Sequence, residues 1–461
     1  MAILAAFAVP HPPVILAEVG QGQEKQIQKT IDAYRSVMHK IAVLSPDTVV
    51  ITSPHSILYA DYFHISPGTE ATGSLRRFGA SEVKVKADYD QIFVNKLSET
   101  ALAAGIPAGT QGERDKALDH GTIIPLYYLN EVYANYRLVR VGLSGLSPLE
   151  HYCLGKCISS TAAALGRRTV VIASGDLSHK LKADGPYGLA PEGLQFDEQV
   201  TKALSKGDFL SLLSIEPKLA EAAGECGLGS LRIMAGALDK KAVDGKLLSY
   251  EGPFGVGYAV AAFIVRGEDE GRCFDKQFEL AEQQKLEKQK AAEDAYVRLA
   301  RLSLETYIKT GKRAELPVNL PPQMLFARAG VFVSLKKYGQ LRGCIGTIAP
   351  TTSSVAKEIM RNAVCAAVED PRFNPVNACE LSELSYSVDV LGEAEKINSP
   401  SQLDVKRYGV IVQAGGRRGL LLPNLEGIDS IEQQIAIAKQ KAGIAANEPV
   451  QLFRFEVVRH K

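Results

Sequence analysis

Apolar runs rich in β-branched residues recur along the first half of this 461-residue chain and alternate with stretches of helical periodicity. Continuous apolar strands separated by amphipathic helices are typical of an α/β domain with three layers and a largely parallel central sheet. The strand-like runs are Ile3–Val9, Thr48–Thr52, Tyr136–Val141 and Thr169–Ala173, and the helical stretches are Glu24–Ala42, Tyr89–Ala104, Pro148–Leu165 and Phe196–Ser205. Two further runs, Leu247–Tyr250 and Tyr258–Val265, are expected to close the sheet at one edge.

The composition changes after Val265, which predicts a domain boundary. Residues 266–291 are dense in Glu, Lys and Gln and are expected to form a charged linker or a solvated helix. A second α/β pattern occupies residues 292–461. Its expected strands are Gly330–Leu335, Leu384–Leu391, Gly409–Val412 and Val450–Val458, and its expected helices are Ser353–Ala367 and Ser430–Ala442. The sequence therefore predicts two domains, at 1–265 and 292–461.

The charge balance and the cysteines narrow the class of protein. Lys and Arg total 53 and Asp and Glu total 52, so the net charge of +1 gives no reason to expect nucleic acid or an anionic membrane as partner. No run approaches the roughly 18 apolar residues of a membrane span. The seven cysteines are scattered and odd in number, which suits reduced thiols in the cytoplasm better than a disulfide framework.

Four of the eight histidines share one local context, in which the histidine follows or lies close after an apolar run among turn-forming residues. They are His11 in AAFAVPHPP, His55 in VVITSPHS, His120 in ALDHGTIIPL and His179 in VVIASGDLSH. The upstream strand is clear for His11, His55 and His179. Because the carboxyl ends of parallel strands meet at one edge of an open sheet, we expect these three imidazoles to converge.

Imidazoles suit zinc, copper or iron, and a nearby carboxylate would complete the two-histidine, one-carboxylate triad of Fe(II) oxygenases. Glu225, in the glycine-flanked turn AAGECGLGSL, is the first candidate for that carboxylate, and the adjacent Cys226 is a softer alternative ligand. Asp176 is expected either to ligate or to orient His179, and Glu251 is a weaker candidate. Spacing alone does not separate a ligand role for Glu225 from that of an ordinary acid at a helix N-terminus.

The ordered segments PHPP, SPHS, DHGTIIPL and SGDLSH resemble the catalytic subunit of class III extradiol ring-cleavage dioxygenases (LigB-type) and its relative, the Memo protein. The resemblance covers residues 1–265. In the dioxygenases two histidines and a glutamate hold Fe(II), and the matching residues here are His11, His55 and Glu225. The resemblance implies an oxidoreductase acting on a small catechol-like aromatic. His179 is then the expected base and His120 the expected acid or oxygen-side donor, with the two roles open to exchange.

Memo relatives carry a cysteine followed by glycine near the carboxylate position, and this chain has both residues, in Glu225-Cys226-Gly227. Ligation by Glu225 implies Fe(II) and ring cleavage. Ligation by Cys226 implies copper or zinc, with metal binding or redox handling and no ring-cleavage turnover. A hydrolase that uses a histidine-bound zinc is a third, weaker hypothesis.

The second half resembles the AMMECR-type domain, an α/β fold with a small subdomain. The matching segments are LRGCIGTIAP (Leu341–Pro350), EDPRFNPV (Glu369–Val376) and GRRGLLLPNLEG (Gly416–Gly427). The fusion resembles the prokaryotic AmmeMemoRadiSam arrangement, which implies a radical SAM protein as functional partner. The sequence leaves homo-oligomer formation open.

The residues of this half suggest a second site. One hypothesis places Arg342, Cys344, Arg372, Arg417 and Arg418 in one polar cleft, with Cys344 beside Arg342 as a nucleophile. The alternative, which the sequence favours, is that Cys344 is a small buried hydrophobe in a glycine-containing turn.

Overall fold

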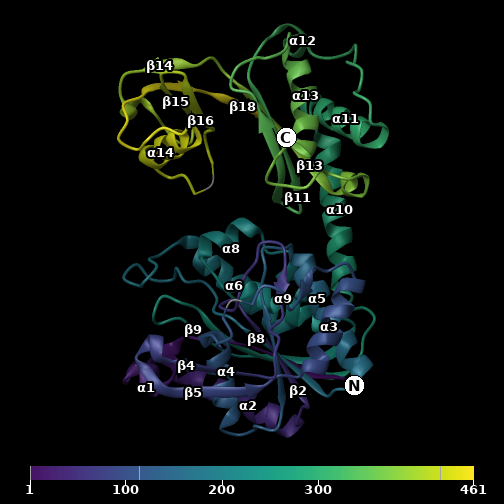
Figure 1. Cartoon of the computed structure of the whole chain (residues 1–461), viewed down its shortest axis with the longest axis vertical. Coiled ribbons are helices and arrows are strands. Elements are labelled where there is room, and N and C mark those ends of the chain that lie inside the picture. Colours follow the sequence, from purple (N-terminus) through teal and green to yellow (C-terminus); the bar gives the residue numbers. More distant parts are fainter. Residues whose placement is uncertain (1, 114, 426) are drawn as a thin grey trace. The chain divides into compact units, whose positions relative to one another are not determined.

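The computed structural model describes residues 2–113, 115–425 and 427–461, and the chain divides into two compact units (Figure 1). The units are Met1–Leu280 and Ala281–Lys461. The division falls inside the stretch predicted as a charged linker, most of which is helix α10 (Phe274–Ala292). Each unit has its own sheets and its own hydrophobic core.

The central sheet of the first unit has six strands in the order β7-β2-β8-β1-β10-β9. The strands are β1 (Ile3–Val9), β2 (Thr48–Ser53), β7 (Arg137–Gly142), β8 (Thr169–Ser174), β9 (Lys241–Glu251) and β10 (Tyr258–Glu268). The pairs β2–β7, β2–β8 and β1–β8 are parallel, whereas β10 pairs antiparallel with β1 and with β9. Every residue of β2 and β8 is buried, which explains their continuous apolar character. The predicted α/β fold with a largely parallel sheet is confirmed.

Helices form a layer on each face of this sheet (Figure 1). One layer contains α2 (Gln28–Leu44) and α4 (His120–Asn130), which pack against each other. The other contains α3 (Gln91–Ala103), α5 (Pro148–Leu165), α6 (Pro191–Lys206), α7 (Phe209–Leu213), α8 (Pro217–Ala223) and α9 (Leu228–Ala237). Short elements η1 (Pro13–Ile15), α1 (Ala17–Gly20) and η2 (Gln23–Ile27) connect β1 to α2.

Two glycines let α5 and α9 touch backbone to backbone. A Cβ on Gly155 of α5 would lie 2.0 Å from the carbonyl oxygen of Ile233, and a Cβ on Gly236 of α9 would lie 1.8 Å from that of Tyr152. Both distances are far below van der Waals contact, so only glycine permits this approach. The contact fixes the position of α9, and Cys226 lies just before that helix begins.

A hairpin that the sequence analysis did not predict lies beside α4. It consists of β4 (Glu70–Leu75), the 3-10 turn η3 (Arg76–Phe78) and β5 (Ala80–Asp88). Its strands alternate buried and exposed residues, so they lack the continuous apolar signal of the central strands. The short strands β3 (Phe63–His64) and β6 (Ala108–Gly109) precede and follow this hairpin in the sequence and pair with each other in parallel.

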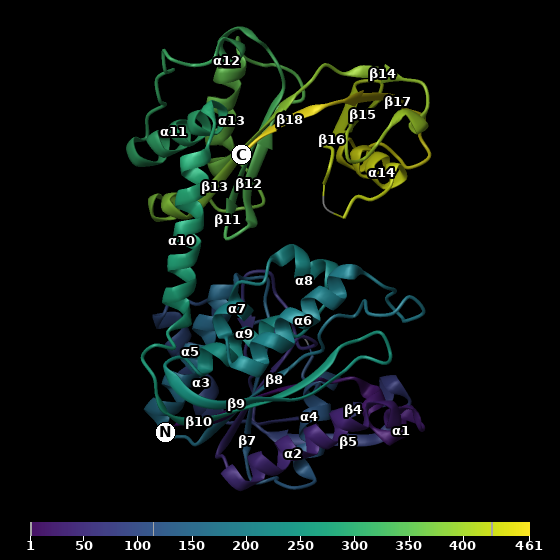
Figure 2. The ribbon, with the colours of Figure 1, turned by 180° about the vertical axis from the view of Figure 1, so that it is seen from behind.

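The second unit contains two four-stranded sheets, seen from behind in Figure 2. The first, β12-β11-β13-β18, packs against α13 and α11, and the second, β14-β17-β15-β16, packs against α14. The strands are β11 (Val331–Lys337), β12 (Gln340–Gly346), β13 (Leu384–Leu391), β14 (Glu395–Ile397), β15 (Gly409–Ala414), β16 (Arg417–Leu421), β17 (Gln451–Phe455) and β18 (Val457–His460). The helices are α11 (Ala295–Thr310), α12 (Pro322–Phe326), α13 (Val355–Val368) and α14 (Ile431–Lys441), with 3-10 turns η4 (Ala378–Glu383) and η5 (Pro400–Gln402).

The predicted terminal strand is divided between these two sheets. β17 pairs with β14 and β15, and after Glu456 the chain continues as β18, which pairs with β13. Of all the helices in the described ranges, none is both long and apolar enough to cross a membrane.

Candidate metal centre

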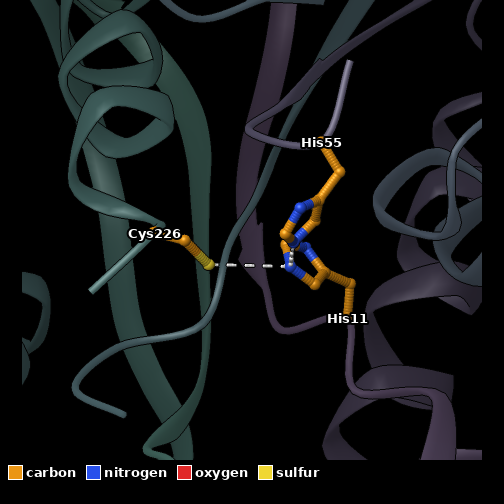
Figure 3. A group of neighbouring side chains, drawn as sticks. All are labelled: His11, His55 and Cys226. Atoms are coloured by element: carbon orange, nitrogen blue, oxygen red, sulfur yellow. Dashed lines mark hydrogen bonds between the residues drawn. The ribbon is translucent and has the colours of Figure 1, made fainter. Parts of the chain in front are cut away.

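Three potential metal ligands from distant parts of the sequence meet at one edge of the central sheet (Figure 3). His11 Nε2 lies 3.0 Å from His55 Nε2 and 3.7 Å from Cys226 Sγ. All three ligand atoms lie within 4.8 Å of one another. His11 is fully buried, Cys226 is partly buried and His55 is exposed, so the group is open to solvent on the His55 side.

The strand register brings the two histidines together. Val9, the last residue of β1, is paired with Ser174 at the end of β8, and Thr52 of β2 is paired with Ala173. The carboxyl ends of these parallel strands are therefore level, and the residues that follow them share one edge. His11 is the second residue after β1 and His55 is the second after β2, which is the convergence expected from the sequence.

Ser174 fixes the tautomer of His11. The Ser174 hydroxyl donates to the Gly121 carbonyl over 2.6 Å and lies 2.9 Å from His11 Nδ1. Because its one proton is already donated, the hydroxyl must accept from His11 Nδ1–H. The lone pair of the ring is then on Nε2, which faces His55 and Cys226. A hydrogen bond on the second ring nitrogen is the usual support of a metal-binding histidine.

Asp176, in the turn after β8, holds two of the three ligand residues. Its carboxylate accepts a hydrogen bond of 2.8 Å from the backbone N–H of His11, and its own backbone N–H donates to Cys226 Sγ over 3.3 Å. Burial raises the pKa of Asp176 to about 7. The structure thus gives Asp176 a positioning role toward His11 and Cys226 in place of the predicted orientation of His179, with which it shares no hydrogen bond among the described residues.

The surroundings keep the imidazoles neutral. Burial lowers the pKa of His11 well below its usual value, and the neighbouring histidines His55, His120 and His179 lower it further. Although the His55 side chain is exposed on one side, desolvation of the part of its ring that faces the site lowers the pKa of His55, against an opposing effect of the Asp119 carboxylate. A neutral imidazole is the form that binds a metal. Burial raises the pKa of the Cys226 thiol well above its usual value, so the thiol must give up its proton on ligation.

The spacing of the three atoms fits a metal ion. Bonds of about 2.0–2.1 Å to nitrogen and about 2.3 Å to sulfur place the ligand atoms of a tetrahedral ion about 3.3 Å apart for two nitrogens and about 3.6 Å apart for nitrogen and sulfur. The separations from His11 Nε2, 3.0 Å to His55 Nε2 and 3.7 Å to Cys226 Sγ, are close to these values. The donor set of two imidazoles and one thiol therefore fits a bound ion without rearrangement of the backbone.

Glu225, the first candidate for the third ligand, is not among the three grouped ligand residues. Its carboxylate accepts a hydrogen bond of 2.6 Å from the backbone N–H of Leu228, the first residue of α9. The side chain therefore caps the helix, which was the ordinary role weighed against ligation. Cys226, the alternative predicted ligand, occupies the third position. Glu251 is also elsewhere, because its carboxylate accepts hydrogen bonds from the backbone and hydroxyl of Thr30 in α2.

His120 and His179 lie beside the three ligands. The His120 ring stacks on His55 with 4.1 Å between centroids and lies 5.2 Å from that of His11. Burial lowers the pKa of His120 to about 4, and the nearby His55 imidazole adds to this, because two adjacent rings do not readily both carry a proton. His179 Nε2 is buried without a hydrogen-bond partner in the structure, and burial also lowers the pKa of His179. Both rings are therefore neutral at pH 7 and free to accept or relay a proton.

Some features of the site carried no recognised sequence signal. His120 is the first residue of α4, capped by Asp119, rather than a residue after a strand. Phe78, in the unpredicted hairpin, contacts the His120 ring, with 5.1 Å between centroids. Tyr187 contacts the His179 ring at the same separation. Ser174, in contrast, could have been predicted from the sequence. It is the last residue of a strand, so its hydroxyl adjoins the sheet edge where the ligands gather.

A second group of ligand-type atoms comes from Asp239, Cys273 and Asp275. The Lys156 ammonium pairs with Asp275 and lies 3.8 Å from Asp239, and the Tyr152 hydroxyl donates to Asp239 over 2.6 Å. Both carboxylates already have partners, Asp275 in Lys156 and Asp239 in Lys156 and Tyr152, so the group is an ion-pair network and differs from the histidine centre.

Arg342, which the sequence analysis places beside Cys344, has a carboxylate partner in the structure. Both residues lie on β12, but the Arg342 guanidinium binds Glu380 through two hydrogen bonds of 2.8 and 2.9 Å and donates to the Asn374 carbonyl. Of the other arginines predicted for one cleft, Arg372 contacts the backbone of Cys344. Arg417 instead pairs with Glu448, and Arg418 lies over the Phe453 ring.

Comparison with family models identifies both units. Residues 5–261, more than half of the chain, match the model of the catalytic LigB subunit of aromatic ring-opening dioxygenase. The chain belongs to this LigB family. Residues 297–460 match the AMMECR1 family model, so the chain is a LigB domain fused to an AMMECR1 domain, as the sequence motifs predicted.

Relatives match the whole of this chain or about a third of it. Protein CA_C1420 of Clostridium acetobutylicum is 40% identical over 469 residues, and the alignment covers 100% of this chain and 100% of that protein. A protein of Thermotoga maritima is 47% identical over 171 residues, which cover 37% of this chain and 98% of that protein. The crystal structure of PH0010 from Pyrococcus horikoshii is 36% identical, with a TM-score of 0.34, and covers 36% of this chain and 88% of its own.

Proposed function

We propose that the LigB domain binds one metal ion through His11, His55 and Cys226 and that the protein is a Memo-like metal-binding protein. The observation that carries this proposal is the thiol of Cys226 at the position expected for a carboxylate. A donor set of two imidazoles and a thiolate suits copper or zinc, whereas two histidines and a carboxylate suit Fe(II) oxygenases. A bound ion would supply Lewis-acid chemistry, and redox chemistry if it is copper.

The protein around the three ligands suits an ion that meets a second molecule. His11 and Cys226 are fixed by Ser174 and Asp176, whereas His55 is exposed. Catalytic metal sites usually have three protein ligands and one coordination position open to a substrate or water. Purely structural sites are closed by a fourth protein residue.

Metal content after purification without oxygen or chelator tests this proposal. We expect about one ion per chain, loss of that ion in His11→Ala, and retention in His39→Ala. His39 is an exposed histidine of α2, so its replacement removes an imidazole without touching the site. Stoichiometric binding that survives loss of both His11 and His55 would overturn the assignment.

We also propose a second function, extradiol ring cleavage of a catechol-like substrate with Fe(II). It is favoured by His120 and His179, two neutral imidazoles beside the ligands that are suited to take a proton from a diol and to return one to oxygen. Oxygen uptake by iron-loaded protein with catechols, protocatechuates and aminophenols separates the two functions. Uptake supports ring cleavage, and its absence from fully loaded protein leaves the Memo-like function.

The fusion supports a further part of the proposal, in which the protein acts with a radical SAM partner in a modification system. What supports it is the joining of the LigB and AMMECR1 domains in one chain. Affinity purification of the full chain from its own host, with identification of partners by mass spectrometry, tests this. A radical SAM protein that is retained by wild type is the expected result.

A further inference from the structure

Cys344 of the AMMECR1 domain lies on the face of its sheet that α13 does not cover. Its neighbour Gly343 faces α13 so closely that a Cβ there would lie 2.0 Å from the carbonyl oxygen of Ala366. Because successive residues of a strand point to opposite faces, Cys344 points away from the helix. Ser334 of β11 is its register partner, and the Ser334 hydroxyl donates to Cys344 Sγ over 3.2 Å.

The second sheet of this domain packs against a neighbouring part of the same face. Phe332, two residues before Ser334, packs against a cluster formed by Ile411, Leu420 and Phe455 of the second sheet and by Leu391. Cys344 is partly exposed and lies beside this seam between the two sheets. Residues from both sides of the seam can therefore reach its thiol.

Cationic side chains from three separate elements gather around Cys344. Arg372 donates to the Cys344 carbonyl over 3.3 Å and is held by Asp370, which also accepts the Cys344 backbone N–H over 2.8 Å. Arg459 of β18 forms an ion pair with Asp389 of β13. Phe332, Asp389 and Arg459 are register partners on three neighbouring strands, so their side chains lie on one face of the sheet. Both arginines are thus locked in place by a carboxylate.

Lys441 is the last residue of α14, the helix that packs against the second sheet. Its ammonium interacts electrostatically with both Cys344 and Arg372, and burial lowers the pKa of Lys441. Among the described residues no carboxylate pairs with it. With Arg372 and Arg459 balanced by one aspartate each, Lys441 leaves the surroundings of the thiol with a net positive charge, which attracts anions.

We propose that Cys344, Arg372 and Lys441 form a binding site for a small oxyanion that carries an electrophilic carbon, with the Cys344 thiol as the nucleophile. A cysteine beside Lys and Arg is typical of reactive thiols. In the reaction, the thiol proton passes to solvent, a bond forms between Sγ and the electrophilic carbon, and the leaving group departs with the electron pair of the broken bond. The site is independent of the metal centre.

Alkylation of the full-length protein by iodoacetate and by iodoacetamide tests the proposal, because the two reagents differ in charge. Mass spectrometry of the Cys344 and Cys379 peptides gives the rate at each residue, with Cys379 as an exposed reference thiol in the same domain. We expect the iodoacetate-to-iodoacetamide ratio to be several-fold higher at Cys344 than at Cys379. High salt should remove the difference, and inorganic phosphate should protect Cys344 alone.

Lys441→Gln should lower the ratio at Cys344 by about two- to three-fold, the order of effect expected from removing one nearby positive charge in a water-like dielectric. Lys357→Gln is the matched control, because Lys357 is an exposed lysine on α13, behind the sheet. Equal ratios at the two cysteines, an equal effect of the two lysine variants, or a Cys344 that neither reagent modifies in the folded protein would each overturn the proposal.

Discussion

Replacing Glu225 and Cys226 by alanine, one at a time, separates the two adjacent residues that compete for the third ligand position. The structure assigns them different tasks, since the Glu225 carboxylate caps α9 and the Cys226 sulfur faces His11. We therefore expect Glu225→Ala to reduce the stability of the LigB domain and leave metal binding intact. Cys226→Ala should weaken metal binding and cost less stability than Glu225→Ala.

The magnitudes follow from the contacts that each alanine removes. Glu225→Ala loses a hydrogen bond of 2.6 Å from a backbone N–H to a carboxyl group, which contributes about 1.5–3 kcal/mol. For a domain of this size the loss lowers the melting temperature by about 5–10 °C. Cys226→Ala removes one sulfur atom from a partly buried position and costs about 1 kcal/mol of stability. Loss of a direct ligand should weaken metal binding by more than about 100-fold, the upper end for loss of a supporting hydrogen bond.

Two measurements on the same samples test these values. Thermal unfolding in the presence of chelator gives the stability of the metal-free variants, and competition with a chromogenic chelator gives their zinc affinity. Calorimetric titration in buffers of different ionisation enthalpy gives the protons released on binding. Wild type and Glu225→Ala should each release about one proton from the thiol, and Cys226→Ala about none, because neutral imidazoles release none.

The opposite pattern would refute the assignment. If Glu225→Ala lost zinc and Cys226→Ala kept it, with proton release unchanged in Cys226→Ala, the carboxylate would be the third ligand. The iron-dependent ring-cleavage function would then gain support over the Memo-like one.

Of three further predictions, two concern the support of the centre and the third concerns Asp197, a buried carboxyl group of α6. Ser174→Ala should weaken zinc binding by about 10–100-fold in the same competition assay with little change in melting temperature, because the His11 tautomer is no longer fixed. Gly155→Ala should cost about 1–3 kcal/mol in urea unfolding and also weaken zinc binding, since it displaces α9 and Cys226; unchanged binding would contradict the link between the two. Burial raises the pKa of Asp197 to about 6, so the folded state holds a proton that the unfolded chain has lost, and stability should fall by up to about 3 kcal/mol as the pH rises from about 4 to 6. Urea unfolding across this range should show a flatter profile for Asp197→Asn.

The sequence by itself determined the fold class of the LigB domain and the place of its centre. The strands β1, β2 and β8 are buried on both faces. A strand in this position needs apolar side chains throughout, which is why its sequence is a continuous apolar run. Since the ends of parallel strands are level, the position of His11 and His55 two residues after their strands was enough to predict that they meet. The alternating hairpin β4–β5 gave no such signal and was missed.

Only the tertiary structure distinguishes the surroundings of Glu225 from those of Cys226. The two residues are adjacent, and both are chemically competent ligands, so the choice depends on the direction in which each side chain points. That direction depends on where α9 begins and on the contact at Gly155 and Gly236 that positions the helix. Neither can be predicted from the local sequence around residue 225. The same holds for Arg342, since only the tertiary structure shows that its guanidinium binds Glu380, a carboxylate distant in the chain.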